Sequence, residues 1–185
     1  MNSVPLPEVL RPKTLGDFVG QEHLVGKDGV VRKLLLNAKK SGFFPSLILW
    51  GPPGSGKTTL ARIIASNLER EFHEFSAVNT SSTDIQKVTK RAVGERLFPA
   101  PVVFIDEIHR FNKAQQDKLL PYVERGDIIF IGATTENPSF EVIAPLLSRS
   151  RVLVLNQLSI EEIETIIKKA EKYLKLRLDK KTRAF

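Results

Sequence analysis

Eight consecutive residues constrain the fold of this chain more than any other feature of its sequence. Residues 51–58 match the pattern G-x-x-x-x-G-K-[ST], and they follow a short apolar run at residues 47–50 and precede a helical pattern at residues 58–69. A phosphate-binding loop requires this order, because its glycines let backbone N–H groups turn toward phosphate oxygens at the N-terminus of the next helix. The complete pattern in this setting predicts nucleotide binding, and a Gly- and Pro-rich surface turn is the alternative.

The positions of this loop have distinct expected contacts. The predicted nucleotide-binding residues are Gly51, Pro52, Pro53, Gly54, Ser55, Gly56, Lys57, Thr58 and Thr59. In loops of this kind the lysine, here Lys57, reaches the β- and γ-phosphates, and the hydroxyl of Thr58 is a ligand of Mg²⁺. The expected ligands are a nucleoside triphosphate and Mg²⁺.

Two adjacent carboxylates follow the apolar run at residues 102–105, which is a second predicted strand. Asp106 is expected at the end of that strand, beside the loop, where it orients the Mg²⁺ shell and helps to hold the nucleotide. Glu107 is expected to polarise the attacking water as the catalytic base. Simple nucleotide kinases have less need of the second carboxylate, because their acceptor replaces water. The pair therefore predicts an NTPase.

Short apolar runs alternate with helical patterns along most of the chain. The runs that predict strands are residues 47–50, 75–78, 102–105, 128–131 and 152–155, and helical patterns lie at residues 58–69 and 83–93. The runs at 47, 102 and 128 are almost wholly apolar, which is typical of strands covered on both faces. This alternation predicts an α/β fold with a doubly wound, parallel, five-stranded sheet.

A domain boundary is expected near residue 157. Ser159 and Glu162 form a predicted capping box, and apolar residues then recur at helical spacing up to Leu174 without a following strand. Residues 1–157 are therefore predicted to form the nucleotide-binding α/β domain. Residues 158–185 are predicted to be the first helix of a second, truncated domain.

Composition excludes several classes of protein. The chain has no cysteine and three scattered histidines, which argues against disulfides and a structural metal site. No stretch has the roughly 18 or more apolar residues of a membrane span, so no membrane contact is expected. Most of the net charge of +7 lies in residues 168–183, which hold eight basic and two acidic residues. Charge alone therefore does not predict DNA binding.

The segments GPPGSGKTT, FIDEIHR, FIGATTENPSF and LLSRSRV together resemble AAA+ ATPases of the clamp-loader clade. DEIHRFNKAQQD and IGATTENPSFE are most similar to the replication-associated recombination protein A family, the bacterial relatives of the Werner-helicase-interacting protein. The resemblance covers residues 11–178. It implies a DNA-dependent ATPase in replication-fork maintenance, recombination and repair, located in the cytoplasm with the nucleoid. The implied partners are DNA forks and single-strand/double-strand junctions, further copies in a homo-oligomer (a tetramer at full length), single-stranded DNA-binding protein and replisome components.

The resemblance also implies roles for residues outside the loop. Residues that match the family's adenine-wrapping segment are Arg11, Pro12, Val19, Gly20 and Gln21. An ordinary Pro- and Gly-bearing lead-in is the alternative for this segment. Thr134 matches the sensor-1 residue, which contacts the γ-phosphate or the lytic water, and Thr135 is the other candidate. Arg149 matches the arginine finger, which acts on a neighbouring subunit, and Arg151 competes with it.

Some expectations stay open at the level of sequence. The family's sensor-2 arginine and oligomerisation region are expected beyond residue 185, after the first helix of the helical lid. A helix over residues 110–117 is either a solvated helix beside the nucleotide site or a relay to Glu107. Lys87, Lys90 and Arg91 are candidate phosphate contacts to DNA. Two rival classes are a DExH helicase, which needs a second RecA-like domain, and a nucleotide-binding structural subunit of a clamp-loader or Holliday-junction assembly.

Overall fold

A parallel five-stranded sheet forms the centre of the computed structural model, which describes residues 4–80, 85, 87–89, 91 and 99–176. The strands are β1 (Ser46–Trp50), β2 (Phe72–Ser76), β3 (Val102–Asp106), β4 (Ile129–Thr134) and β5 (Ser150–Val154). Their order is β2-β3-β4-β1-β5, and every neighbouring pair is parallel. The predicted α/β fold with a parallel five-stranded sheet is confirmed.

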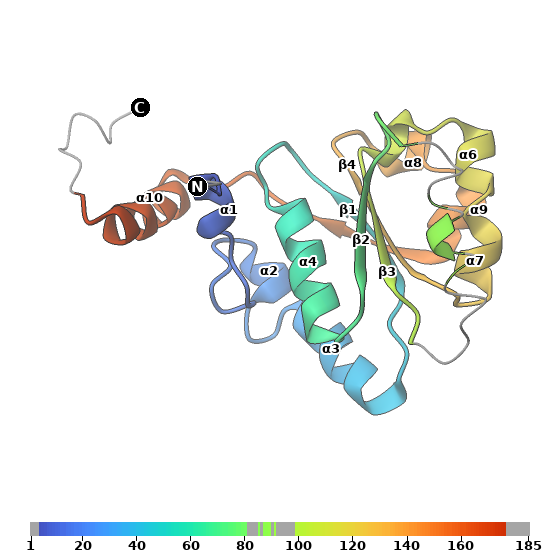
Figure 1. The fold of residues 1–185 in the computed structure, drawn as a ribbon, viewed down its shortest axis with the longest axis horizontal. Coiled ribbons are helices and arrows are strands. Elements are labelled where there is room, and N and C mark those ends of the chain that lie inside the picture. The colour runs from blue at the N-terminus through green and yellow to red at the C-terminus, as the bar shows by residue number, and fades with distance from the viewer. Residues whose placement is uncertain (1–3, 81–84, 86, 90, 92–98, 177–185) are drawn as a thin grey trace.

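Helices cover both faces of this sheet, as a doubly wound fold requires. The helices are α1 (Leu6–Val9), α2 (Glu22–Val25), α3 (Val30–Ser41), α4 (Lys57–Asn67), α6 (Lys113–Asp117), α7 (Leu120–Glu124), α8 (Pro138–Glu141), α9 (Ala144–Ser148) and α10 (Ile160–Leu174), with a 3₁₀ turn η1 (Ile108–Arg110). Figure 1 shows α3 and α4 on one side of the sheet and α6 to α9 on the other, with α10 extending away beside α1. The carboxyl ends of β1, β3 and β4 lie at one edge, where open α/β sheets bind their ligands.

Alternation along the central strands supplies a core to each face. In β1, Leu47 and Leu49 pack in the cluster that includes Leu60 of α4, while Ile48 packs in the opposite cluster with Leu146 of α9. All five of these side chains are fully buried. Burial of each such side chain contributes about 1.5–3 kcal/mol, so both helical layers hold the sheet firmly. This rigid frame fixes where the loops at the carboxyl edge begin.

The strand boundaries differ from the sequence-based prediction at the edges of the sheet. The strand predicted at 75–78 is β2, which lies at Phe72–Ser76. As an edge strand it is mostly half-buried, and its polar residues obscure the apolar pattern that marks a strand. The strand predicted at 128–131 runs on to Thr134 as β4, since a buried Gly132 does not interrupt the ladder with Ile48. The last strand starts two residues earlier than predicted, at Ser150.

The single helix predicted over residues 110–117 is wrong. The 3₁₀ turn η1 ends at Arg110, Phe111 is extended and buried, and a new helix starts at Lys113. Asn112 separates η1 from α6, because its side chain accepts a hydrogen bond from the Gln115 N–H and so caps the start of α6. The helix predicted at 83–93 lies largely outside the described residues, although residues 85, 87–89 and 91 are helical. Lys90 also lies outside them.

The predicted capping box of the last helix is confirmed. Ser159 accepts from the Glu162 N–H at 3.2 Å, and the Glu162 carboxylate accepts from the Ser159 N–H at 2.7 Å. Lys169 of α10 donates to the backbone carbonyl of Asp17 at 2.8 Å, which ties the helix to the N-terminal segment. The division into domains at residue 157 stays a prediction. Among the described residues, no helix is long and apolar enough to cross a membrane.

Candidate functional site

The phosphate loop connects β1 to α4 at the carboxyl edge of the sheet. Gly54 and Gly56 have φ angles of 75° and 96°, a left-handed conformation that side chains with a Cβ rarely adopt. A Cβ on Gly56 would also lie 2.6 Å from the ring of Phe18. The sequence therefore needs glycine at both positions to bend the loop into a cradle of N–H groups.

Lys57 and Ser55 lie within this loop with their polar groups turned inward. The Lys57 ammonium donates to the carbonyls of Gly51 and Pro52 at 2.8 and 3.0 Å, which holds the loop curled around it. Burial lowers the pKa of Lys57, while the carboxylates of Glu107 and Asp106 act in the opposite direction. The Ser55 hydroxyl is buried and has no hydrogen-bond partner among the described residues. A buried hydroxyl without a partner and a desolvated cation both favour an incoming anion, so the loop fits a phosphate group.

Asp106 ends β3 beside the loop, as predicted. Burial raises the pKa of its carboxyl, and repulsion from Glu107 raises it further, although the Glu107 N–H donates to its Oδ1 at 3.1 Å. The charged form of this carboxyl is therefore disfavoured, and a nearby cation would stabilise it. No cluster of three or more His, Cys, Asp or Glu among the described residues could hold a metal ion alone. The hydroxyl of Thr58 and the carboxylate of Asp106 are oxygen ligands that suit Mg²⁺, which fills its other positions with water and phosphate oxygens.

Glu107 has an unusual backbone for a carboxylate residue. Its φ and ψ are 54° and 46°, in the left-handed region, so the chain turns sharply between β3 and η1. One carboxylate oxygen, Oε2, is buried without a hydrogen-bond partner and lies 3.2 Å from Nδ1 of His109. Residues kept in such conformations cluster at functional sites, because the surrounding structure must hold them there. The geometry therefore places an unsatisfied carboxylate beside the phosphate loop.

Thr134 ends β4, between β3 and β1, and is fully buried. Its hydroxyl lies 3.0 Å from Nδ1 of His109 and also contacts the backbone N–H and carbonyl of Glu136 at 3.0 and 3.2 Å. Its backbone carbonyl accepts from the N–H of Gly51, the first loop residue, at 3.2 Å. The structure thus joins Thr134 directly to the phosphate loop and, through His109, to Glu107. Thr135 is the next residue and lies beyond the strand.

A cleft of about 450 Å³ lies beside the phosphate loop, between the N-terminal segment and α10. Three of the predicted adenine-wrapping residues, Arg11, Pro12 and Val19, line it together with Gly56 and Ile166. Its walls are largely apolar, which suits a flat aromatic base. The cleft therefore fits a nucleoside next to a loop that fits its phosphates.

Gln21 and Gly20, the other two predicted residues of that segment, act at its end. The amide of Gln21 is buried and makes two hydrogen bonds with the backbone of Asn156, donating at 2.6 Å and accepting at 2.8 Å. A Cβ on Gly20 would lie 2.8 Å from Leu158. Both polar groups of the Gln21 side chain thus bond to the linker before α10, which connects the N-terminal segment to that linker.

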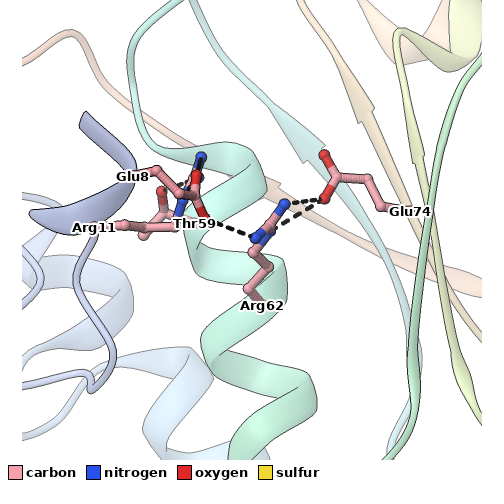
Figure 2. Close-up of polar contacts among 5 residues, drawn as sticks. All are labelled: Glu8, Arg11, Thr59, Arg62 and Glu74. Carbon is pink, nitrogen blue, oxygen red and sulfur yellow. Dashed lines mark hydrogen bonds and ion pairs between the residues drawn. The ribbon is translucent and has the colours of Figure 1, made fainter. Parts of the chain in front are cut away.

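Arg11 also fixes the N-terminal segment to the helix that follows the loop. Figure 2 shows its guanidinium between Glu8 and Thr59, and Arg62 of α4 between Glu8 and Glu74. The Arg11 guanidinium donates to the Thr59 hydroxyl at 3.1 Å. The ion-pair distances are 2.6 Å for Glu8–Arg11, 3.1 Å for Glu8–Arg62 and 2.6 Å for Arg62–Glu74. These groups are partly exposed, so solvent weakens each pair, but together the pairs tie α1 to α4.

Arg149 lies at the opposite edge of the sheet. It directly precedes β5, whose Ser150 pairs with Ser46 at the start of β1, whereas the phosphate loop begins after Trp50. A strand of this length spans about 16 Å at about 3.3 Å per residue, so Arg149 cannot contact its own loop. Its guanidinium instead forms an ion pair with Glu124 of α7 at 2.8 Å. Arg151 is exposed on β5.

Two contacts of this site were not predicted from the sequence. No role was predicted for His109, whose only signal in the sequence is its position two residues after Glu107. The hydrogen bonds between Gln21 and Asn156 join residues 135 positions apart, so no local sequence pattern predicts them. Both contacts depend on how distant segments meet at the carboxyl edge.

The fold and the loop define a P-loop nucleotide-binding protein. Residues 47–160 match the model of the ATPase family associated with various cellular activities (AAA), and the chain belongs to this family. The predicted AAA+ class is therefore confirmed.

Similar proteins carry the name expected from the resemblance. The Replication-associated recombination protein A of Haemophilus influenzae is 47% identical over 167 residues, which cover 90% of this chain and 36% of that protein. The ATPase WRNIP1 of Dictyostelium discoideum is 48% identical over 178 residues, 96% of this chain and 20% of that protein. A solved structure of the Thermotoga maritima RuvB Holliday junction branch migration motor has a TM-score of 0.77 and 36% identity, covering 92% of this chain and 56% of that one. The chain thus spans about a third of the length of the first relative.

Proposed function

We propose that this chain is the ATP-hydrolysing part of a Mg²⁺-dependent ATPase that acts on DNA during replication and recombination. The observation that carries the proposal is the meeting of Lys57, Glu107 and Thr134 at one edge of the sheet, where β1, β3 and β4 end. Hydrolysis needs a group on the phosphates, a base for water and a group that senses the terminal phosphate. This edge offers all three beside a cleft that fits a nucleoside.

Each residue at this edge has a distinct proposed role in ATP hydrolysis. Lys57 neutralises the β- and γ-phosphates, while the N–H groups of the loop orient them. Thr58 and Asp106 would hold Mg²⁺, which when bound neutralises charge on the phosphate oxygens. Glu107 accepts a proton from the water that attacks the γ-phosphate, and Thr134 orients the γ-phosphate or that water. Thr134 is favoured over Thr135 because it ends the buried strand and reaches Glu107 through His109.

Arg149 is proposed to serve the site of a neighbouring copy in a homo-oligomer, which we expect to be a tetramer in the complete protein. The support is its position at the edge away from its own loop, where its guanidinium is partly exposed. An arginine that reaches a neighbour's γ-phosphate stabilises charge in the transition state, by roughly 10³–10⁵ in rate. Assembly and hydrolysis would then depend on one another.

DNA is proposed as the partner that hydrolysis serves, with forks and single-strand/double-strand junctions as the expected structures. The names of the relatives from Haemophilus influenzae and Thermotoga maritima refer to recombination and to Holliday-junction migration, which supports this choice. Single-stranded DNA-binding protein and replisome components are further proposed partners, and the nucleoid in the cytoplasm is the proposed location. A nucleotide-binding structural subunit is the second candidate, but such a subunit does not need Glu107 beside Lys57.

The test is the rate of ATP hydrolysis by the complete protein with and without forked DNA. We expect Mg²⁺-dependent turnover that rises when forked DNA is added and rises less with blunt duplex DNA of equal length. ATP binding without turnover under all these conditions would favour the structural subunit and overturn the proposal.

A further inference from the structure

His109 lies between the two groups that are proposed to act on the terminal phosphate and its water. It belongs to η1, and its side chain is 11% exposed. One ring atom, Nδ1, lies 3.0 Å from the hydroxyl of Thr134 and 3.2 Å from Oε2 of Glu107. Two oxygen atoms, one at the end of β4 and one just after β3, therefore compete for one nitrogen.

The chemistry of imidazole limits how this competition is resolved. If Nδ1 lacked its proton, its lone pair would face the Glu107 carboxylate, which is unfavourable, so the neighbourhood selects the form with a proton on Nδ1. A single N–H is directed well toward only one acceptor. In this structure the contact with Thr134 has hydrogen-bond geometry, whereas Oε2 of Glu107 is buried without a partner.

We propose that His109 is a positioning residue for Glu107 and links it to the state of Thr134. When the Thr134 side chain rotates about χ1 and carries its hydroxyl oxygen away from His109 to a phosphate oxygen, Oε2 of Glu107, at 3.2 Å, is left to accept the Nδ1 proton. That hydrogen bond then holds the carboxylate in the direction needed to accept a proton from water. The base is thereby aligned only when the terminal phosphate is in place.

The backbone of Glu107 makes such a guide necessary. The residue leaves β3 in a left-handed conformation, so the strand does not fix its side-chain direction as it does for Asp106. Asp106 receives the Glu107 N–H at 3.1 Å, but no described group donates to Oε2 of Glu107. His109, two residues later on the short turn η1, has Nδ1 3.2 Å from Oε2 and can supply that donor.

Three substitutions separate the Nδ1 proton from the shape of the side chain. His109→Asn places its amide nitrogen on Cγ, as Nδ1 is placed, whereas His109→Gln moves the amide one atom further out, toward the place of Nε2. His109→Leu keeps similar bulk and removes all donors. In the complete protein we expect kcat to fall about 10- to 100-fold in the Leu and Gln variants, with little change in KM, because a misplaced base slows chemistry and not binding. The Asn variant is expected to stay within about threefold of the parent rate.

The inference rests on the proposed function, and the controls distinguish failure of the role of His109 from failure of the proposed function. Melting curves and ATP titrations check that each variant folds and binds nucleotide; if the Leu variant does not fold, the comparison of Asn with Gln decides alone. Equal losses in Asn and Gln, or parent-like turnover in Gln, would overturn the role of His109. Glu107→Gln, measured in parallel, should be inactive. An active Glu107→Gln would overturn the proposed function itself, whatever the His109 variants do.

Discussion

The guanidinium of Arg149 lies 2.8 Å from the carboxylate of Glu124, at the edge of the sheet away from the phosphate loop. Glu124 ends α7 and Arg149 follows α9, so the pair joins two helices on the same face of the sheet (Figure 1). Both side chains are more than two-fifths exposed, at 46% and 44%, which leaves the guanidinium accessible to a neighbouring molecule. The pair therefore holds the proposed finger in place without burying it.

Arg149→Ala should leave ATP binding intact and remove DNA-stimulated hydrolysis, because the lost charge serves the neighbour's phosphates. Mixing gives a direct test. A Lys57→Ala subunit has an inactive loop with an intact finger, and an Arg149→Ala subunit has the reverse, so mixed oligomers should recover activity that neither variant has alone.

Arg151→Ala is the matched control, since Arg151 is an exposed arginine two residues away on β5. It should hydrolyse ATP at nearly the parent rate. Lack of recovery in mixtures, despite proven co-assembly, would show that Arg149 acts within its own subunit or only supports the fold.

Lys57→Ala should abolish tight ATP binding. The ammonium lies inside the loop, and its removal leaves the phosphate charges facing Asp106 and Glu107 without compensation. Titration calorimetry measures the affinity, with Lys39→Ala on the exposed side of α3 as the control. Unchanged affinity in the Lys57 variant would refute the assignment of this loop to phosphate binding.

Much of this site was predictable because its residues lie in short, local patterns. The phosphate loop and the pair Asp106–Glu107 each follow an apolar strand, and a strand end in a parallel sheet has only one edge to occupy. The edge strand β2 was misplaced by three residues because half-buried positions tolerate polar side chains, so its alternation is weak. Contacts between segments, such as His109 with Thr134, depend on the strand order and cannot be read from spacing along the chain.

Asp106→Asn should stabilise the protein without ligand while it abolishes Mg²⁺-dependent hydrolysis. The pKa of Asp106 is raised by burial and by Glu107, so near neutral pH the folded state carries an unfavourable charge that Asn removes. The folded state binds this proton more tightly than the unfolded state does. The advantage of the Asn variant is therefore largest above the raised pKa and disappears as the pH falls through it.

Melting temperatures of parent and variant between about pH 4 and pH 8 give this difference. Asp117→Asn, at an exposed position on α6, is the control and should show no such trend. A variant that melts below the parent at neutral pH would contradict the assigned environment of Asp106.

Gln21→Leu should weaken nucleotide binding with little effect on the chemical step. The substitution removes both hydrogen bonds to the backbone of Asn156, each contributing about 0.5–1.5 kcal/mol, and frees the linker before α10. Because α10 lines the nucleoside cleft, KM for ATP should rise while kcat stays close to the parent value. Steady-state kinetics and urea unfolding of the complete protein check both effects, and a fall in kcat at unchanged KM would contradict this structural role.

Glu107→Gln is the decisive test of Glu107 as the base for water in an ATPase site. The substitution keeps the shape of the side chain and removes its ability to accept the proton. In the complete protein with Mg²⁺ and forked DNA, we measure ATP affinity by calorimetry and turnover by phosphate release, with Glu141→Gln, on the exposed end of α8, as the control. We expect Glu107→Gln to bind ATP as the parent does while turnover falls by about 10²-fold or more, and Glu141→Gln to be unaffected. Turnover of Glu107→Gln close to that of the parent would rule out Glu107 as the base.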